Sequence, residues 1–169
     1  RSKDGTKALD WAPSLGAGRR VTAVRTYPRT GLVFLGLSDG TVMEVRVSYR
    51  STFDAAGKRT IEPSVAALEP VAIGKPGLPC VDVWNAKGSL TRLLLVRQEE
   101  AGKPMLTAVR LTERKGLGGK ARVVVSDPFV VAADATSISQ ILLPSTAESL
   151  IVVGKSVAAY GAAAKGNTL

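Results

Sequence analysis

The sequence predicts an all-β protein. Runs rich in Val, Leu and Ile recur along the chain, and Gly, Pro, Asp, Asn and Ser bound each of them. Short apolar runs between turn residues are typical of β-strands. No stretch keeps a helical period for three turns, and Gly161 interrupts the Ala-rich residues 158–164, which we interpret as a strand end and a frayed terminus.

The clearest element is a β-hairpin over residues 31–47, GLVFLGLSDGTVMEVRV. Two apolar runs lie on either side of Ser38, Asp39, Gly40 and Thr41. An Asp-Gly pair between alternating apolar runs favours a tight turn, because glycine adopts the left-handed conformation that such turns require. The pattern predicts one strand from Leu32 and a second from Thr41.

Three parts of the chain resemble one another. An acidic residue close to a proline occurs in each, at Asp10, Glu69 and Asp127, and VAALEPVAI from residue 65 aligns without a gap with VVVSDPFVV from residue 123. A strand-like run begins eleven or twelve residues after each acid, at Val21, Val81 and Ile138, so the repeat period is 60 and then 57 residues. Such periods indicate repeated supersecondary units.

Each unit contains further strands. The second unit continues with runs from Leu90 and Met105, joined by a loop over residues 97–104, and the third continues with runs from Ser149 and Ser156. We expect blade-like units of four short strands at about 16–73, 74–131 and 132–160, preceded by a strand over 6–15 that ends a unit. The acids beside the prolines are interpreted as caps of backbone N–H groups.

This tandem four-stranded pattern resembles the blades of β-propeller proteins of the WD-repeat-like kind, although the Gly-His and Trp-Asp dipeptides of WD repeats do not occur. The resemblance implies a single partial domain over residues 1–169 with about three blades of a β-propeller. Closed propellers have four to eight blades. We therefore expect the arc to be completed by further blades of the same polypeptide, by a second copy or by another subunit. A β-sandwich is the alternative fold.

Apolar residues at alternate positions of these runs predict the core. They are Val33, Leu35, Val42, Val45, Leu93, Leu95, Val124, Ile151 and Val153.

The chain is basic, with 23 Lys and Arg against 14 Asp and Glu and a formal net charge of +9. This balance points to an anionic partner, which could be RNA, an acidic protein surface or a charged headgroup layer, although solvated surface charge is an equal alternative. The candidate contacts are Arg19, Arg20, Arg25, Arg29, Arg50, Lys58, Arg59, Arg114, Lys115, Lys120 and Arg122.

Several kinds of site are disfavoured by composition. The chain has no histidine and one cysteine, Cys80, which rules out an internal disulfide, zinc sites built on Cys and His, and the Ser-His or Cys-His pairs of many hydrolases. Gly154, Lys155 and Ser156 lack the earlier glycine of a phosphate-binding loop. We predict no catalytic residue, cofactor or metal, and interpret Cys80 as a small buried residue.

No apolar run approaches the roughly 20 residues of a membrane span. We expect a soluble protein of unknown localisation. Because the sequence begins without methionine, we also consider an organellar or processed product.

Three functions remain open. The first is a non-catalytic scaffold, a β-propeller segment that binds other subunits of a larger assembly. The second is a basic module that contacts RNA or another polyanion in a ribonucleoprotein complex. The third is a propeller-type enzyme or sugar-binding domain with carboxylates in its central channel, which is disfavoured because the carboxylates show no paired spacing.

Overall fold

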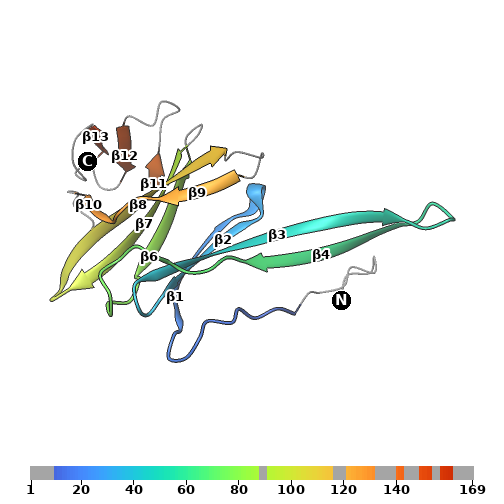
Figure 1. The fold of residues 1–169 in the computed structure, drawn as a ribbon, viewed down its shortest axis with the longest axis horizontal. Coiled ribbons are helices and arrows are strands. Elements are labelled where there is room, and N and C mark those ends of the chain that lie inside the picture. Colours follow the sequence, from blue (N-terminus) through green and yellow to red (C-terminus); the bar gives the residue numbers. More distant parts are fainter. Residues whose placement is uncertain are drawn as a thin grey trace.

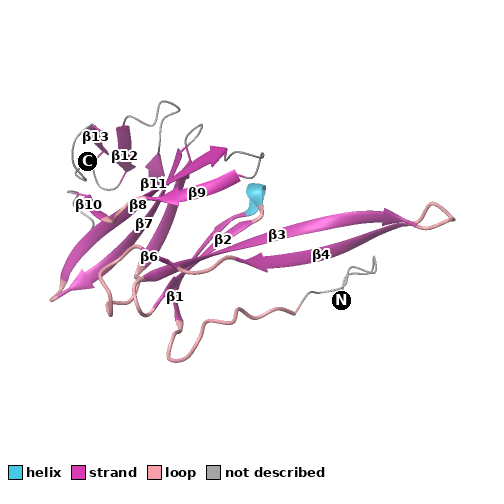
Figure 2. Cartoon of the chain, viewed as in Figure 1, coloured by secondary structure: helices cyan, strands magenta, loops and turns pink. Residues whose placement is uncertain are grey.

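The computed structural model describes residues 10–87, 91–115, 121–131, 140–142, 149–153 and 157–161. The first sheet has the order β1 (Val21–Tyr27), β2 (Leu32–Leu37), β3 (Thr41–Phe53) and β4 (Arg59–Ala67), all antiparallel. The short β5 (Val71–Ala72) pairs with the beginning of β3, and a single 3-10 turn, Pro28–Thr30, joins β1 to β2 (Figures 1 and 2).

The second sheet repeats this plan. Strands β6 (Asp82–Lys87), β7 (Thr91–Glu100) and β8 (Lys103–Lys115) form an antiparallel meander. Two short strands, β9 (Ala121–Val125) and β10 (Phe129–Val131), pair with opposite ends of β8. A third sheet contains β11 (Gln140–Leu142), β12 (Ser149–Val153) and β13 (Val157–Gly161).

The repeated acid-proline pair interrupts the outer strand of both sheets at the same place. Residues 68–70 lie opposite residues 43–44 of β3, between the β4 and β5 pairings, and residues 126–128 lie opposite residues 109–110 of β8, between β9 and β10. Three residues thus oppose two in each sheet, as in a β-bulge. Proline is tolerated there because the interrupted position needs no ladder N–H.

The capping role predicted for the repeated acids is wrong. Within the part of the chain that the structure describes, the side chains of Asp10, Glu69 and Asp127 form no hydrogen bond. The predicted strand over residues 6–15 is also not formed over residues 10–15, and residues 6–9 lie outside the described ranges.

The hairpin turn at residues 38–41 is confirmed. The Asp39 carboxylate accepts hydrogen bonds from the backbone N–H and the hydroxyl of Thr41, at 3.1 and 2.7 Å. Gly40 has a φ of +87°, and a Cβ there would lie 2.7 Å from the carbonyl oxygen of Lys75. Only glycine fits this turn, both for its conformation and for its packing.

The connection over residues 97–104 differs from the prediction. Strands β7 and β8 continue until Glu100 pairs with Lys103, so only Ala101 and Gly102 form the turn. Both have positive φ, 50° and 75°, as a two-residue hairpin turn requires. The strand ends are hard to recognise in the sequence because residues 97–104 are mostly polar or charged. Alanine, found here at position 101, is also not a residue that indicates this type of turn.

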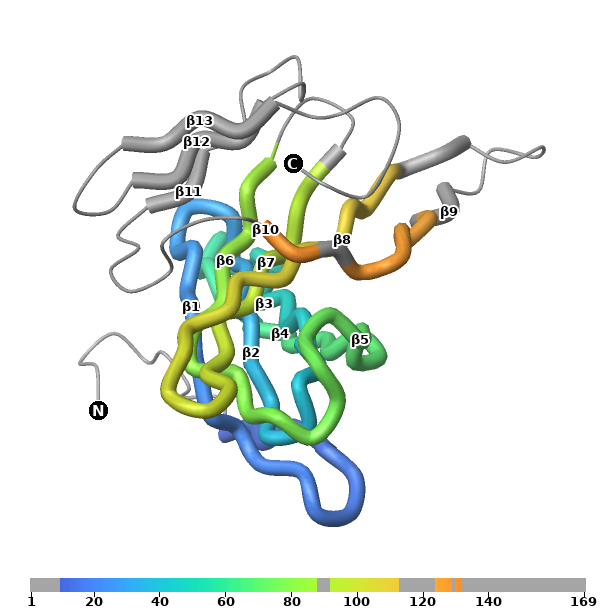
Figure 3. Tube along the Cα trace, turned by 90° about the vertical axis from the view of Figure 1, so that its left-hand side faces the viewer, coloured from blue at the N-terminus to red at the C-terminus, as the bar shows by residue number. Residues whose placement is uncertain are grey.

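The first and second sheets pack face to face. Ala23, Phe34 and Val42 of the first sheet form one cluster with Val83, Leu94, Val96, Val109 and Leu111 of the second. Viewed from the side in Figure 3, β1 lies beside β6. Strand β6 also contacts β11. The ring of Tyr27 packs edge-on against Phe34, and its hydroxyl accepts a hydrogen bond from the backbone N–H of Asn85 in β6.

Both faces of the two sheets contribute to the core. On the other face of the first sheet, Leu35, Leu37, Met43 and Val45 form a second cluster against Leu15 of the N-terminal segment. Both faces of β7 are buried, since Leu93, Leu94, Leu95 and Val96 each have an exposed fraction of 2% or less. A central strand buried on both faces is typical of stacked sheets.

The predicted core is confirmed in part. The buried residues are Leu35, Val42, Val45, Leu93 and Leu95. Val33 is half-buried, and Val124 is 37% exposed because β9 lies at the outer edge of the second sheet. The side chains of Ile151 and Val153 lie outside the described part of the structure, as do residues 154–156.

The all-β class is confirmed, and in the described ranges no sheet closes on itself. The same ranges contain no helix of the length and apolarity that a membrane crossing requires.

Candidate interaction surface

A two-stranded arm extends from the first sheet (Figure 1). Strand β3 pairs with β2 only as far as Arg46, but it continues to Phe53 and pairs with β4 along this whole extension. We define the arm as residues 47–65. In the part of the chain that the structure describes, no third strand pairs with this extension, so each of its edges lacks a neighbouring strand.

One face of the arm is apolar. Side chains alternate between the two faces of a strand, and the register pairs Tyr49 with Pro63, Ser51 with Ile61 and Phe53 with Arg59. These residues therefore share a face, which the hydrogen bonds from the Arg59 guanidinium to the Ser51 hydroxyl confirm. Tyr49, Phe53 and Ile61 are 71%, 67% and 44% exposed.

The opposite face is polar. Ser48 and Ser64 are joined by a hydrogen bond between their hydroxyl groups, 2.7 Å long, and Arg50 lies opposite Glu62. At the tip, the Asp54 carboxylate accepts hydrogen bonds from the backbone N–H groups of Ala56 and Lys58. The arm is thus an amphipathic ribbon with an ordered turn.

Three of the predicted anion contacts lie together on the arm. Arg50, Lys58 and Arg59 are all exposed and lie in the outer part of the arm, towards its tip. Arg114 and Arg122 are paired across β8 and β9, next to Lys115, so a second group of basic positions lies on the second sheet. Side-chain positions of these three residues, and all of Lys120, lie outside the described part of the structure.

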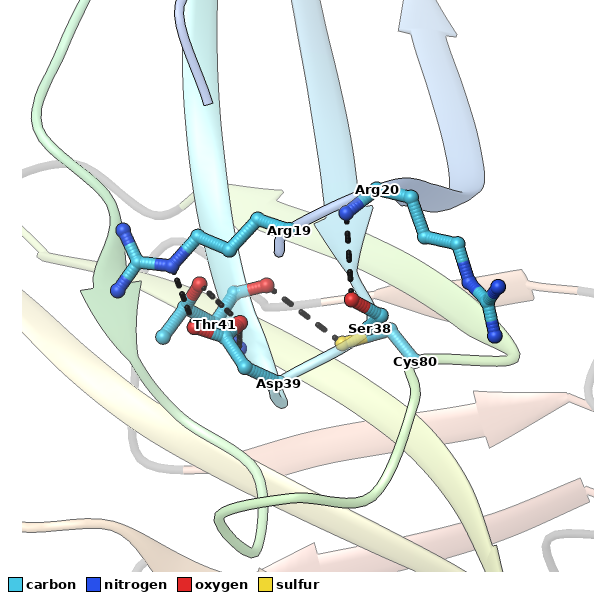
Figure 4. A network of polar contacts seen from close by, with 6 residues as sticks. All are labelled: Arg19, Arg20, Ser38, Asp39, Thr41 and Cys80. Carbon is cyan, nitrogen blue, oxygen red and sulfur yellow. Dashed lines mark hydrogen bonds and ion pairs between the residues drawn. The ribbon is translucent and has the colours of Figure 1, made fainter. Parts of the chain in front are cut away.

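Arg19 is engaged within the protein. Its Nε donates to the Asp39 carboxylate at 2.6 Å (Figure 4). Burial opposes ionisation of Asp39, but its hydrogen bonds from Thr41 and Arg19 and the charge of Arg19 outweigh burial and lower its pKa. The backbone N–H of Arg20 donates to the Ser38 hydroxyl, while its side chain extends away from this network.

Arg25 also has internal partners. Its guanidinium binds the Asp82 carboxylate and the carbonyl oxygen of Val83, and it lies over the ring of Trp84. Arg25 therefore joins β1 to β6. Arg29 lies exposed in the 3-10 turn between β1 and β2.

A cleft separates the N-terminal segment from the first sheet. It has a volume of about 560 Å³, and its lining includes Trp11, Leu15, Arg19, Met43, Leu68 and Glu69. In the described ranges no three His, Cys, Asp or Glu side chains are grouped as a metal site would require. Cys80 is buried, as predicted, and burial raises the pKa of its thiol to about 11, so it is protonated and poorly nucleophilic at neutral pH.

Sequence reasoning missed the apolar face of the arm. The usable signal is the run TFDAAGKRTIEP, in which Asp54 and Gly57 bound a turn between two stretches of β-forming residues. Tyr49, Phe53 and Ile61 look like core residues in such a pattern. They are exposed because the cluster that buries Met43 and Val45 on the same face of β3 does not extend along the arm, which the local sequence does not show.

Comparison with protein-family models, with curated proteins and with solved structures finds no match to this chain.

Proposed function

We propose that this chain is a non-catalytic protein-interaction module and that the arm is its docking element. The observation that carries the proposal is the apolar face of the arm. Tyr49 and Phe53 have the highest exposed fractions among the large hydrophobic residues that the structure describes. Exposed aromatic residues beside arginine are the composition of protein-binding hot spots.

The body of the protein fits a scaffold role. We propose that the first and second sheets are neighbouring blades of a β-propeller arc. Their face-to-face packing, the equivalent interruptions at Pro70 and Pro128, and the proximity of β6 to both β1 and β11 support this assignment. In such an arc the arm extends outward from a rigid base, as binding loops do on other β-scaffolds.

A display library of random ten-residue peptides tests the docking role. The purified chain, immobilised, is compared with the double variant Tyr49→Ser/Phe53→Ser, which removes the apolar face but keeps the ladder of the arm. We expect the chain to enrich a defined set of sequences and the variant to lose that enrichment at least tenfold.

The matched control is Val24→Ser/Val130→Ser. These valines are 57% and 53% exposed, and they lie on β1 and β10, away from the arm. The control should retain the enrichment. Equal enrichment by the arm variant, or no enrichment by any form of the chain, would contradict the proposal.

RNA binding is a second candidate function. Arg50, Lys58 and Arg59 lie on the same arm as Tyr49 and Phe53, and aromatic rings among basic residues are used to bind single-stranded nucleic acids. Affinity for a 15-nucleotide oligouridine should then fall steeply between 50 and 200 mM salt, because phosphate contacts release counterions. A flat response would exclude this function.

A further inference from the structure

The two edges of the arm differ. The backbone N–H of Val47 donates to the carbonyl oxygen of Gly31, on the β2 side of β3. In an antiparallel strand the N–H and C=O groups of alternate residues point to the same side. The backbone groups of Tyr49, Ser51 and Phe53 therefore point the same way as those of Val47, beyond the last residue of β2 that pairs with β3.

The hydrogen bonds between β3 and β4 agree with this direction of the backbone groups. The backbone N–H of Leu68 donates to the carbonyl oxygen of Glu44, so the even-numbered residues of β3 are the ones that face β4. In the described residues, Tyr49, Ser51 and Phe53 have no strand on their outward side. This edge of β3 is an unpaired row of donors and acceptors.

The outer edge of β4 is blocked. Pro63 lies opposite Tyr49, in a pair that does not share ladder hydrogen bonds, so its nitrogen points outward. Proline has no N–H to donate there, and proline on an edge strand hinders the addition of another strand. The open edge of β3 and the blocked edge of β4 leave one side of the arm for pairing.

We propose that the arm binds its partner by strand addition to the free edge of β3, over Tyr49–Phe53. This inference rests on the proposed docking role of the arm and specifies its binding mode. The partner supplies an extended segment whose backbone continues the ladder and whose side chains alternate between the two faces of the arm.

The side chains of the arm specify the chemistry of that segment. Its residues on one face lie beside Tyr49 and Phe53 and are apolar. Its residues on the other face lie beside Arg50, which has no ion-pair partner in the described ranges, and are acidic. The other arginine of this part of β3, Arg46, is ion-paired with Glu44, so Arg50 is the arginine that remains for the partner segment. Opposite charges across neighbouring strands stabilise pairing.

A second copy of this chain fits this edge less well. Each copy has a net charge of +9, and two β3 edges would bring arginines together. Like charges on neighbouring strands oppose pairing. An alternating acidic and apolar segment of another protein is therefore the occupant.

The test uses the whole chain and a synthetic eight-residue peptide that alternates glutamate with valine or isoleucine. A peptide with lysine in place of glutamate and a 15-nucleotide oligouridine are compared with it. Amide hydrogen exchange of the complex is followed by NMR. We expect at least tenfold protection of the Tyr49, Ser51 and Phe53 amides and no added protection of the Ile61 and Val65 amides.

A pair of variants at one position gives a second readout. Ser51→Pro removes an outward N–H, whereas Ser51→Ala removes the same hydroxyl and keeps the N–H. We expect Ser51→Pro to weaken binding of the acidic peptide at least tenfold and Ser51→Ala to bind within twofold of the original. Pro63→Ala, which restores an N–H on the other edge, should leave the affinity unchanged.

The outcomes separate the two proposals. Binding that requires Tyr49 and Phe53 but gives no protection of the β3 edge, or is equal for Ser51→Pro and Ser51→Ala, overturns strand addition and leaves the docking role. Preference for the lysine peptide or for oligouridine overturns the acidic partner. If peptide binding does not depend on Tyr49 and Phe53, both proposals are overturned.

Discussion

Arg25 and Asp82 form a two-pronged contact between the two sheets: Nη2 of Arg25 on β1 lies 2.8 Å from both carboxylate oxygens of Asp82, the first residue of β6. The same guanidinium donates through Nε to the carbonyl oxygen of Val83 at 3.1 Å and lies 5.2 Å from the centre of the Trp84 ring. One side chain thus fixes the position of β1 against the neighbouring sheet.

Removing this guanidinium should loosen the sheet contact. We expect Arg25→Met to lower the free energy of unfolding by about 1.5–3 kcal/mol, the usual contribution of hydrogen bonds to charged groups. Arg25→Lys should recover only part of this, since an ammonium cannot reproduce the planar fork. Urea denaturation measures both. The double variant Arg25→Met/Asp82→Asn should lose less than the sum of the single losses, and strict additivity would argue against direct coupling.

Gln98 holds the segment that links the two sheets. Its buried side chain accepts a hydrogen bond from the Lys75 N–H and donates to the carbonyl oxygens of Lys75 and Leu78. Gln98→Leu keeps the volume but leaves these backbone groups without partners, so we expect a loss of about 1–3 kcal/mol in the free energy of unfolding. Chemical denaturation measures it, with the exposed neighbour variant Glu99→Ala as a control within about 0.5 kcal/mol of the original.

The turn at Ala101 is strained. Its φ of 50° is left-handed, a conformation that costs L-residues other than Asn and Asp about 1–2 kcal/mol. Ala101→Asn should therefore raise the free energy of unfolding by about 1 kcal/mol. Gly102→Ala, at a φ of 75°, should change stability in the opposite direction. Thermal melts of both variants measure these changes. A lower melting temperature for Ala101→Asn than for the original chain would contradict this account.

Burial of Cys80 makes its thiol unreactive and links stability to pH. Burial raises the thiol pKa from 9.0 to about 11, partly offset by its hydrogen bond with the backbone of Leu37. The folded state therefore holds the thiol proton more tightly than the unfolded state. Because the thiol of the unfolded chain ionises first, the free energy of unfolding falls as pH rises from 9 towards 11. Iodoacetamide at pH 8 should alkylate the native protein far more slowly than the protein in urea, and Cys80→Ala should lose stability less steeply across that pH window.

Local pattern was sufficient for the strands and for their tight turn. The strands from Val21, Leu32 and Thr41 begin where alternation and turn residues predict them, because side-chain alternation and backbone turn preferences act over a few residues. The acid-proline pairs at Glu69 and Asp127 marked a real structural repeat. Their role was misread as capping, because the sequence does not show that a strand is interrupted opposite the same two positions of its neighbour.

The sequence by itself determined the β class, the repeated order of strands and the excess of positive charge. Only the tertiary structure decided which charges and apolar groups are available to a partner. Arg19 and Arg25 are engaged by Asp39 and Asp82, residues distant in the chain, whereas Arg50 keeps no ion pair in the described ranges. Tyr49 and Phe53 follow the same alternation as the buried Val45 and Met43, but they are exposed because the cluster that buries Met43 and Val45 does not extend to them. Exposure depends on which segments pack over each face of a strand, and that is settled by packing between segments distant in the chain.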